Sequence, residues 1–126
     1  TSAWYAYLRR DDPDHAACKA VLSGGTYGRV TSNFVFDELV TLLRYRADHG
    51  AAVKAGDILR GAGDLEIIRV LPEDEEEAWR RFARDQDKDY SFTDCTSFAL
   101  MRRLGINVAI ATDRHFQQAG FQAALP

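Results

Sequence analysis

The sequence predicts a single α/β domain over residues 1–126, built on a parallel sheet. Helical and extended stretches alternate along the chain, which favours strands joined in parallel by helical crossovers. Short turn signals separate these stretches, and neither a linker nor an internal repeat divides them. The segment 106–111 (INVAIA) is a near-continuous apolar run, as is typical of a strand covered on both faces. These three features together indicate one compact α/β unit.

Two helices are predicted before the first strand. Residues 2–8 (SAWYAYL) have a helical pattern. Asp12 is expected to cap a second helix that has Pro13 at its first position, because Pro has no N–H that a helix start would leave unpaired. Gly24-Gly25 is expected to end that helix.

A strand and two further helices are predicted in the middle of the chain. Residues 30–32 should form a short strand, and Ser32 or Asn33 should cap a strong helix that runs from Phe34 to near Gly50. A weaker helix is expected over 51–61 (AAVKAGDILRG).

The second half of the chain alternates strands and helices. The helix predicted over 73–87 is acidic at its start and basic later, as the helix macrodipole favours. The other expected elements are strands at 67–71, 106–111 and 121–125, a helix at 93–104 that Gly105 ends, and a helical turn at 116–119.

The composition limits the class of protein. With 19 acidic and 16 basic residues the formal net charge is −3, which argues against a broad basic face for nucleic acid. The net charge is compatible with an enzyme that binds phosphate through metal cations, because metal-free carboxylate ligands make the chain acidic. No long apolar run or secretory leader is present, so a reducing cytoplasm is the expected location.

The cysteines and histidines predict no metal site of their own. Cys18 and Cys95 lack the spacing of a zinc site or a disulfide framework. The histidines form no ligand-spaced set, and we expect surface or capping roles for them: His15, His49 and His115.

Glu38 lies in an apolar setting. On a helical wheel of the Phe34 helix it falls between Tyr45 and Leu42, inside an apolar arc, whereas Asp37 falls in the polar gap. A lone buried carboxylate costs several kcal/mol unless a cation or hydrogen bonds compensate. The alternative is a Glu at the edge of the arc that reaches water or an arginine.

Two further acids are similarly placed. Asp94 falls between the apolar Met101 and Phe98 on its helix, although an acid in the first turn also suits a cap. Asp113 follows the 106–111 strand, and the carboxyl ends of such strands are where α/β sheets bind ligands. The alternative for Asp113 is an ordinary turn before a helix.

Taken together, these acids predict one metal site at a sheet edge. No glycine-rich phosphate loop competes, because residues 24–28 (GGTYG) lack the Lys-Ser/Thr of a P-loop and precede a strand. An all-carboxylate ligand set suits Mg²⁺ or Mn²⁺, and such ions commonly serve phosphoryl chemistry. Candidate phosphate contacts are Arg44, Arg46, Arg102, Arg103 and Arg114.

Four ordered segments resemble the PIN-domain family of the VapC toxin type. TSAWYAYLRRDDPDH is similar to the start of these domains, in which an Asp directly precedes Thr-Ser-Ala. TSNFVFDELVTLLRYR resembles the second segment and places Glu38 at its acid, YSFTDCTSFALMRRLGI places Asp94, and ATDRHFQQAGF places Asp113. The first family acid would precede Thr1, so we expect a domain truncated at its N-terminus, without its first, central strand.

This resemblance implies a three-layer α/β/α PIN-like fold and Mg²⁺- or Mn²⁺-dependent endoribonuclease activity on RNA. Glu38, Asp94 and Asp113 would be the metal ligands and catalytic acids. A small VapB-like antitoxin and a homodimer are the partners that the resemblance implies. The open alternatives are a catalytically inactive PIN-like interaction domain and a phospho-acceptor, receiver-like domain.

Overall fold

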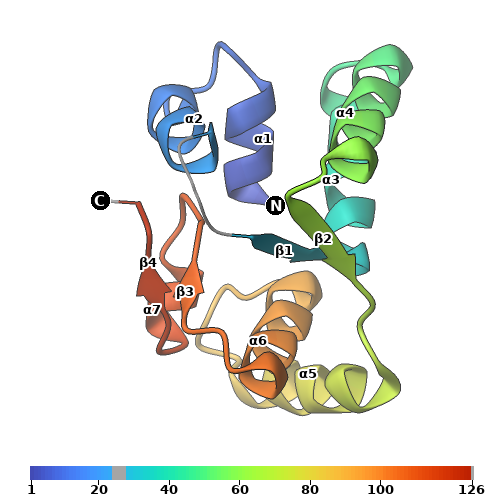
Figure 1. Cartoon of the computed structure of the whole chain (residues 1–126). Helices are drawn as coiled ribbons and strands as arrows, with labels where there is room; N and C mark the ends of the chain where they lie inside the picture. Colours follow the sequence, from blue (N-terminus) through green and yellow to red (C-terminus); the bar gives the residue numbers. More distant parts are fainter. Residues whose placement is uncertain (24–27, 126) are drawn as a thin grey trace.

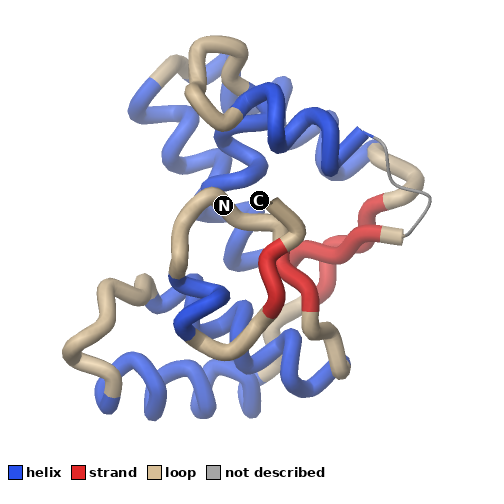
Figure 2. The backbone as a smooth tube through the Cα atoms, turned by 90° about the vertical axis from the view of Figure 1, so that its left-hand side faces the viewer, coloured by secondary structure: helices blue, strands red, loops and turns tan. Residues whose placement is uncertain are grey.

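The computed structural model describes residues 1–23 and 28–125, and it places helices on both sides of a layer of strands. Figure 1 shows α1 to α4 on one side of the strands and α5 and α6 on the other, and the turned view in Figure 2 agrees. The elements are α1 (Ser2–Leu8), α2 (His15–Ser23), β1 (Arg29–Ser32), α3 (Asn33–Arg46), α4 (His49–Gly61), β2 (Leu65–Ile68), α5 (Pro72–Arg84), α6 (Phe92–Leu104), β3 (Val108–Ala109), α7 (His115–Gln118) and β4 (Gln122–Ala123).

All strand pairs of the described residues are parallel, which confirms the predicted α/β class. β1 pairs with β2 over four residues, from Arg29 with Leu65 to Ser32 with Ile68. β3 pairs with β4 through Val108 with Gln122 and Ala109 with Ala123. Within residues 1–23 and 28–125 these pairs form two separate two-stranded sheets, each closed by a helical crossover.

A strand lies within the predicted 106–111, but the predicted length and the predicted coverage on both faces were wrong. β3 contains only Val108 and Ala109, and Val108 is 51% exposed. Ile106 belongs to the preceding helix end, because its N–H donates to the Met101 carbonyl at 2.8 Å. Within the described residues β3 pairs only with β4, through two residue pairs, so few residues of the 106–111 segment take part in strand hydrogen bonding.

The second helix begins later than predicted. α2 starts at His15 and not at Pro13, because the Asp12 carboxylate accepts a hydrogen bond from the Asp14 N–H at 2.9 Å and closes a turn instead of capping the helix. The predicted stop at Gly24-Gly25 lies outside the described residues.

The predicted helix to Gly50 is two helices in the structure. α3 ends at Arg46, since Asp48 caps α4 through a 2.7 Å hydrogen bond from the Ala51 N–H to its carboxylate. Gly50 therefore lies in the first turn of α4, a helix that starts two residues earlier than predicted.

The sequence left open whether Ser32 or Asn33 caps α3, and the structure gives the two residues different roles. Ser32 caps α3, its hydroxyl accepting from the Val35 N–H at 3.0 Å. Asn33 instead accepts a hydrogen bond from the Val70 N–H at 2.8 Å. That contact takes Val70 out of strand pairing, so β2 lies at Leu65–Ile68 and not at the predicted 67–71.

The remaining helices follow the predictions closely, whereas the strand predicted at 121–125 is reduced to Gln122–Ala123 in β4. α1 has the predicted bounds, α6 begins one residue earlier at Phe92, and α5 begins at Pro72 and ends at Arg84. Three apolar clusters hold these helices: Leu39, Leu43, Ala52, Ala55 and Leu59; Ala78, Tyr90, Cys95, Phe98 and Ala119; and Ala3, Ala6, Cys18 and Leu22.

Both cysteines are free and buried, as expected for a chain without a disulfide framework. None of the described helices has the length and apolar character that a membrane crossing requires.

An ion pair between the buried Asp74 and the partly exposed Arg103 joins α5 to α6. Arg103 donates from Nε to Asp74 Oδ1 at 2.9 Å and from Nη2 to Oδ2 at 2.9 Å, and the Leu71 N–H also donates to Oδ2. The hydrogen bond from Arg103 lowers the pKa of Asp74 below its usual value, and Asp74 is only 3% exposed. The suggestion that Arg103 contacts substrate phosphate is therefore withdrawn, because this guanidinium is committed to Asp74.

Replacing Asp74 with Asn should lower the free energy of unfolding near neutral pH by about 2–3 kcal/mol, because the partly buried Arg103 loses its carboxylate. The folded-state pKa of Asp74 is depressed, so this contribution is full above the ordinary carboxyl pKa of about 4 and is lost as pH falls through the folded-state value. Urea unfolding of both proteins near pH ~7 and ~3 measures the difference. An equal difference in the free energy of unfolding between the two proteins at both pH values would contradict the ion-pair account. The control is Glu75→Gln, which changes an exposed carboxylate of the same helix.

Candidate functional site

The amino end of α6 holds Asp94 in a fixed place. The Ser91 hydroxyl accepts from the Asp94 N–H at 2.9 Å, and the Ser91 N–H donates to Asp94 Oδ2 at 3.1 Å, which together form a capping box. The Asp94 side chain is 17% exposed, and the neighbouring Phe98 and Met101 are buried. Both interpretations of Asp94 therefore hold in part: it caps its helix, and it lies half-buried on the apolar side of α6.

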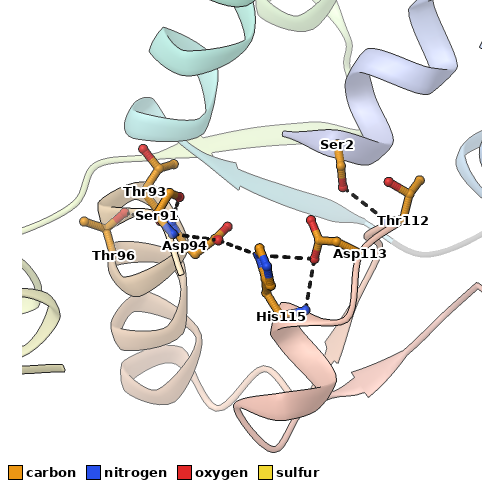
Figure 3. Close-up of polar contacts among 8 residues, drawn as sticks. All are labelled: Ser2, Ser91, Thr93, Asp94, Thr96, Thr112, Asp113 and His115. Atoms are coloured by element: carbon orange, nitrogen blue, oxygen red, sulfur yellow. Dashed lines mark hydrogen bonds and ion pairs between the residues drawn. The ribbon is translucent and has the colours of Figure 1, made fainter. Parts of the chain in front are cut away.

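His115 connects two of the predicted acids. Its Nδ1 lies 2.8 Å from Asp94 Oδ2 and 3.7 Å from Asp113 Oδ1, and Figure 3 shows the imidazole between the two carboxylates. A carboxylate oxygen only accepts hydrogen bonds, so Nδ1 carries the proton and donates to Asp94. The amino end of α6 is thereby joined to the start of α7.

Asp113 lies in the loop between β3 and α7. Its Oδ1 accepts from the His115 N–H at 3.1 Å, a local turn of the kind that the sequence left open as an alternative. The preceding residue, Thr112, donates from its N–H to the Ser2 hydroxyl at 3.1 Å, so the same loop is tied to the start of α1 (Figure 3). Three segments that are distant in sequence therefore meet here.

Glu38 approaches from α3 and is half-buried, whereas the adjacent Asp37 is exposed as predicted. The Glu38 carboxylate forms no hydrogen bond or ion pair with another described side chain. One part of the wheel argument was wrong: Tyr45, assigned to the apolar arc, is 84% exposed. The apolar arc of α3 is therefore buried around Leu39 and Leu43, and it is exposed to water at Tyr45, near the carboxyl end of the helix.

The three acids share one electrostatic neighbourhood. The negative charges of Glu38, Asp94 and Asp113 all act on the backbone nitrogen of Thr1, the residue that directly precedes α1. All three carboxylates therefore lie near the start of α1. They are neighbours without being a closed ligand set, since no group of three or more His, Cys, Asp or Glu side chains in residues 1–23 and 28–125 is arranged to hold a metal ion.

His115 is the site residue that the sequence reasoning missed. His15 fits the expected capping role, with Nδ1 2.9 Å from the Ala6 carbonyl oxygen, and His49 is exposed. His115 differs because it contacts Asp94, 21 residues earlier in the chain. The available signal was its position two residues after Asp113, inside the segment that carries one of the predicted acids.

The other arginines proposed for phosphate contact remain predictions. Arg44, Arg102 and Arg114 are exposed, and the Arg46 guanidinium lies 5.7 Å from the centre of the Tyr5 ring. At that distance the ring face attracts the cation and restricts its position.

Comparison with known proteins gives consistent matches over nearly the whole chain. The PIN domain family matches residues 1–122. The sequence is 39% identical over 126 residues to the 23S rRNA-specific endonuclease VapC20 of Mycobacterium tuberculosis strain H37Rv, covering 100% of this chain and 95% of the relative. The same protein of strain CDC 1551 / Oshkosh is equally similar, at 39% identity and the same coverage.

The fold agrees with this similarity. The crystal structure of Mycobacterium tuberculosis VapC20, described as a sarcin-ricin loop cleaving toxin, superposes with a TM-score of 0.92 at 38% identity. The superposition covers 99% of this chain and 95% of that one. The match includes every segment that carries one of the three acids.

Replacing Ser91 with Ala removes the hydroxyl that accepts from the Asp94 N–H, and we expect the free energy of unfolding to fall by about 1 kcal/mol. Ser91→Thr keeps an acceptor and should recover most of that loss. Chemical denaturation of the three proteins measures it. A Ser91→Ala protein as stable as wild type would show that the capping box does not hold the amino end of α6.

Proposed function

The chain belongs to the PIN-domain family, and on that premise we propose that it is a divalent-metal-dependent endoribonuclease, the toxin of a type II toxin–antitoxin pair. The observation that carries the proposal is that Glu38, Asp94 and Asp113 lie around the start of α1, with His115 between Asp94 and Asp113. Each acid comes from a different element, and each stands in the segment that resembles its counterpart in the family. A receiver-like phospho-acceptor has no support from these matches.

We assign the ion to Glu38, Asp94 and Asp113 on the chemistry of the donors. Hard, charged oxygen donors are the ligands that Mg²⁺ and Mn²⁺ prefer, and three like charges in one neighbourhood repel each other until a cation is present. When bound, such an ion stabilises the negative charge of a phosphodiester transition state and activates water. The contribution of this chain is to hold the acids: the capping box and His115 fix Asp94, and the Ser2 contact fixes the loop of Asp113.

The first RNA to test follows from the relative. VapC20 is described as 23S rRNA-specific and as cleaving the sarcin-ricin loop. Because the similarity extends over the whole of this chain, we propose structured ribosomal RNA as its substrate class, and the bacterial cytoplasm as its place of action.

We propose that a VapB-like antitoxin binds in a groove between two helical pairs. A cavity of about 510 Å³ lies between α1–α2 and α3–α4, and its apolar lining includes Leu43, Ala55 and Ile58. Its basic lining comprises Arg9, Arg10, Lys19 and Lys54. A lining that is both apolar and basic complements an amphipathic segment that carries acidic residues.

A homodimer is supported by an exposed aromatic cluster. Trp79 and Phe82 of α5 are 59% and 40% exposed. Their rings stack with centres 5.9 Å apart, and each ring also packs edge to face with Phe92, which in turn packs with Phe34. A contiguous aromatic surface of this kind commonly marks a protein interface, so we place the dimer contact here.

Full-length protein, with any residues upstream of Thr1, should cleave sarcin-ricin loop RNA in the presence of Mg²⁺ or Mn²⁺ and not in EDTA. Glu38→Gln and Asp94→Asn should each lower the cleavage rate at least a hundredfold, because each removes a charged donor to the ion. Asp37→Asn is the matched control: it changes the same charge one residue away, on the exposed face of α3, and should leave the rate within about twofold.

The outcomes separate the endoribonuclease from the catalytically inactive interaction domain. Metal-dependent cleavage that survives Glu38→Gln would place the active site elsewhere. A folded protein that neither binds Mn²⁺ nor cleaves any RNA of a mixed panel would instead be an inactive PIN-like interaction domain.

If the antitoxin binds in the groove between α1–α2 and α3–α4, reversing the charge at Lys54 should weaken antitoxin binding about tenfold or more. Titration of the cognate antitoxin into wild type, Lys54→Glu and the distant control Lys88→Glu measures this. Equal losses in both variants would point to general charge attraction and not to the groove.

A further inference from the structure

We propose that His115 is a positioning residue, which holds the Asp94 carboxylate so that its second oxygen faces the divalent cation. This inference rests on the proposed function and names a residue that the three-acid site does not include.

The hydrogen bonds of Asp94 are distributed unequally between its two oxygens. Oδ2 accepts from the Ser91 N–H at 3.1 Å and from His115 Nδ1 at 2.8 Å. Oδ1 accepts no hydrogen bond from the described residues. Two donors on one oxygen restrict rotation of the carboxylate, and they leave the other oxygen available to a cation (Figure 3).

His115 is itself held in place from two sides. Its ring packs edge to face against Tyr90, with ring centres 5.8 Å apart and planes at 81°. Tyr90 is buried and packs in turn against Phe98, at 5.0 Å between ring centres. The backbone of His115 is held as well, because its main-chain N–H donates to the Asp113 carboxylate. A donor fixed in this way spends little conformational entropy when it orients its partner.

The contact has two possible roles, which predict different measurements. If His115 only stabilises the fold, its replacement lowers the free energy of unfolding and leaves the affinity for metal unchanged. If it positions Asp94, the loss of the Nδ1 donor weakens metal binding even where ring packing is kept. Outer-shell partners of metal ligands commonly change metal affinity by about 10–100-fold.

Two substitutions separate the donor from the ring. His115→Phe keeps an aromatic ring against Tyr90 and removes the hydrogen-bond donor. His115→Asn removes the ring and keeps an N–H donor close to the position of Nδ1. The exposed His49→Asn, at the start of α4, is the control for loss of a histidine.

The experiment measures Mn²⁺ binding to the full-length protein without RNA, by calorimetric titration at one pH, together with thermal unfolding. We expect His115→Phe to weaken Mn²⁺ binding about tenfold or more, and His115→Asn and His49→Asn to stay within about threefold of wild type. In cleavage of sarcin-ricin loop RNA, His115→Phe should lower kcat and leave KM for the RNA unchanged, because Asp94 is misoriented while the RNA contacts persist.

Three results would overturn the inference. Wild-type affinity in folded His115→Phe would show that the donor is not needed. Equal loss in His115→Phe and His115→Asn would assign the effect to ring packing. Absence of Mn²⁺ binding by the wild type would overturn the proposed function as well, whereas the first two results leave that function intact.

Discussion

The capping box at the start of α6 is the interaction on which the candidate site depends. Ser91 and Asp94 satisfy each other's backbone N–H groups, which any helix start must do. The same Asp94 oxygen accepts from His115, so a single carboxylate caps the start of α6 and also joins it to the loop that carries Asp113. Local helix stability and the geometry of the site are therefore coupled, and a carboxylate that would be costly to bury alone is satisfied by its donors.

The rest of the fold keeps this helix end in place. The ion pair between Asp74 and Arg103 joins α5 to the carboxyl end of α6, and Phe98 anchors the middle of α6 in the aromatic core. α3 contributes Glu38 from across the strands, with its own start fixed by the Ser32 cap. Caps and hydrogen bonds thus place the acids. Asp94 and Asp113 are linked through His115, whereas Glu38 is held separately on α3, which suits a site that assembles around a cation.

Much of this architecture was predictable because the signals are local. Caps, turn residues and the periodicity of apolar residues lie within a few positions of each other, and they predicted α1, β1, α5 and α6 to within about three residues at each end. The wheel of α3 also identified Glu38 as unusual. The errors came from contacts between distant segments: the hydrogen bond from Val70 to Asn33 shifted β2, and the role of His115 arises from a contact that no spacing rule contains. Tyr45 was misjudged because a wheel does not show where the packed partner of a helix ends.

The central claim is that Glu38, Asp94 and Asp113 form one divalent-metal site. The most direct measurement is a crystal structure of the full-length protein grown or soaked with Mn²⁺, with anomalous diffraction collected at a wavelength where manganese scatters. The account predicts an anomalous peak between these carboxylates, with Asp94 Oδ1 among the contacting oxygens at the ~2 Å distance typical of such small hard cations. A fully occupied Mn²⁺ peak held elsewhere by other side chains, or none beside these acids at saturating Mn²⁺, would contradict it.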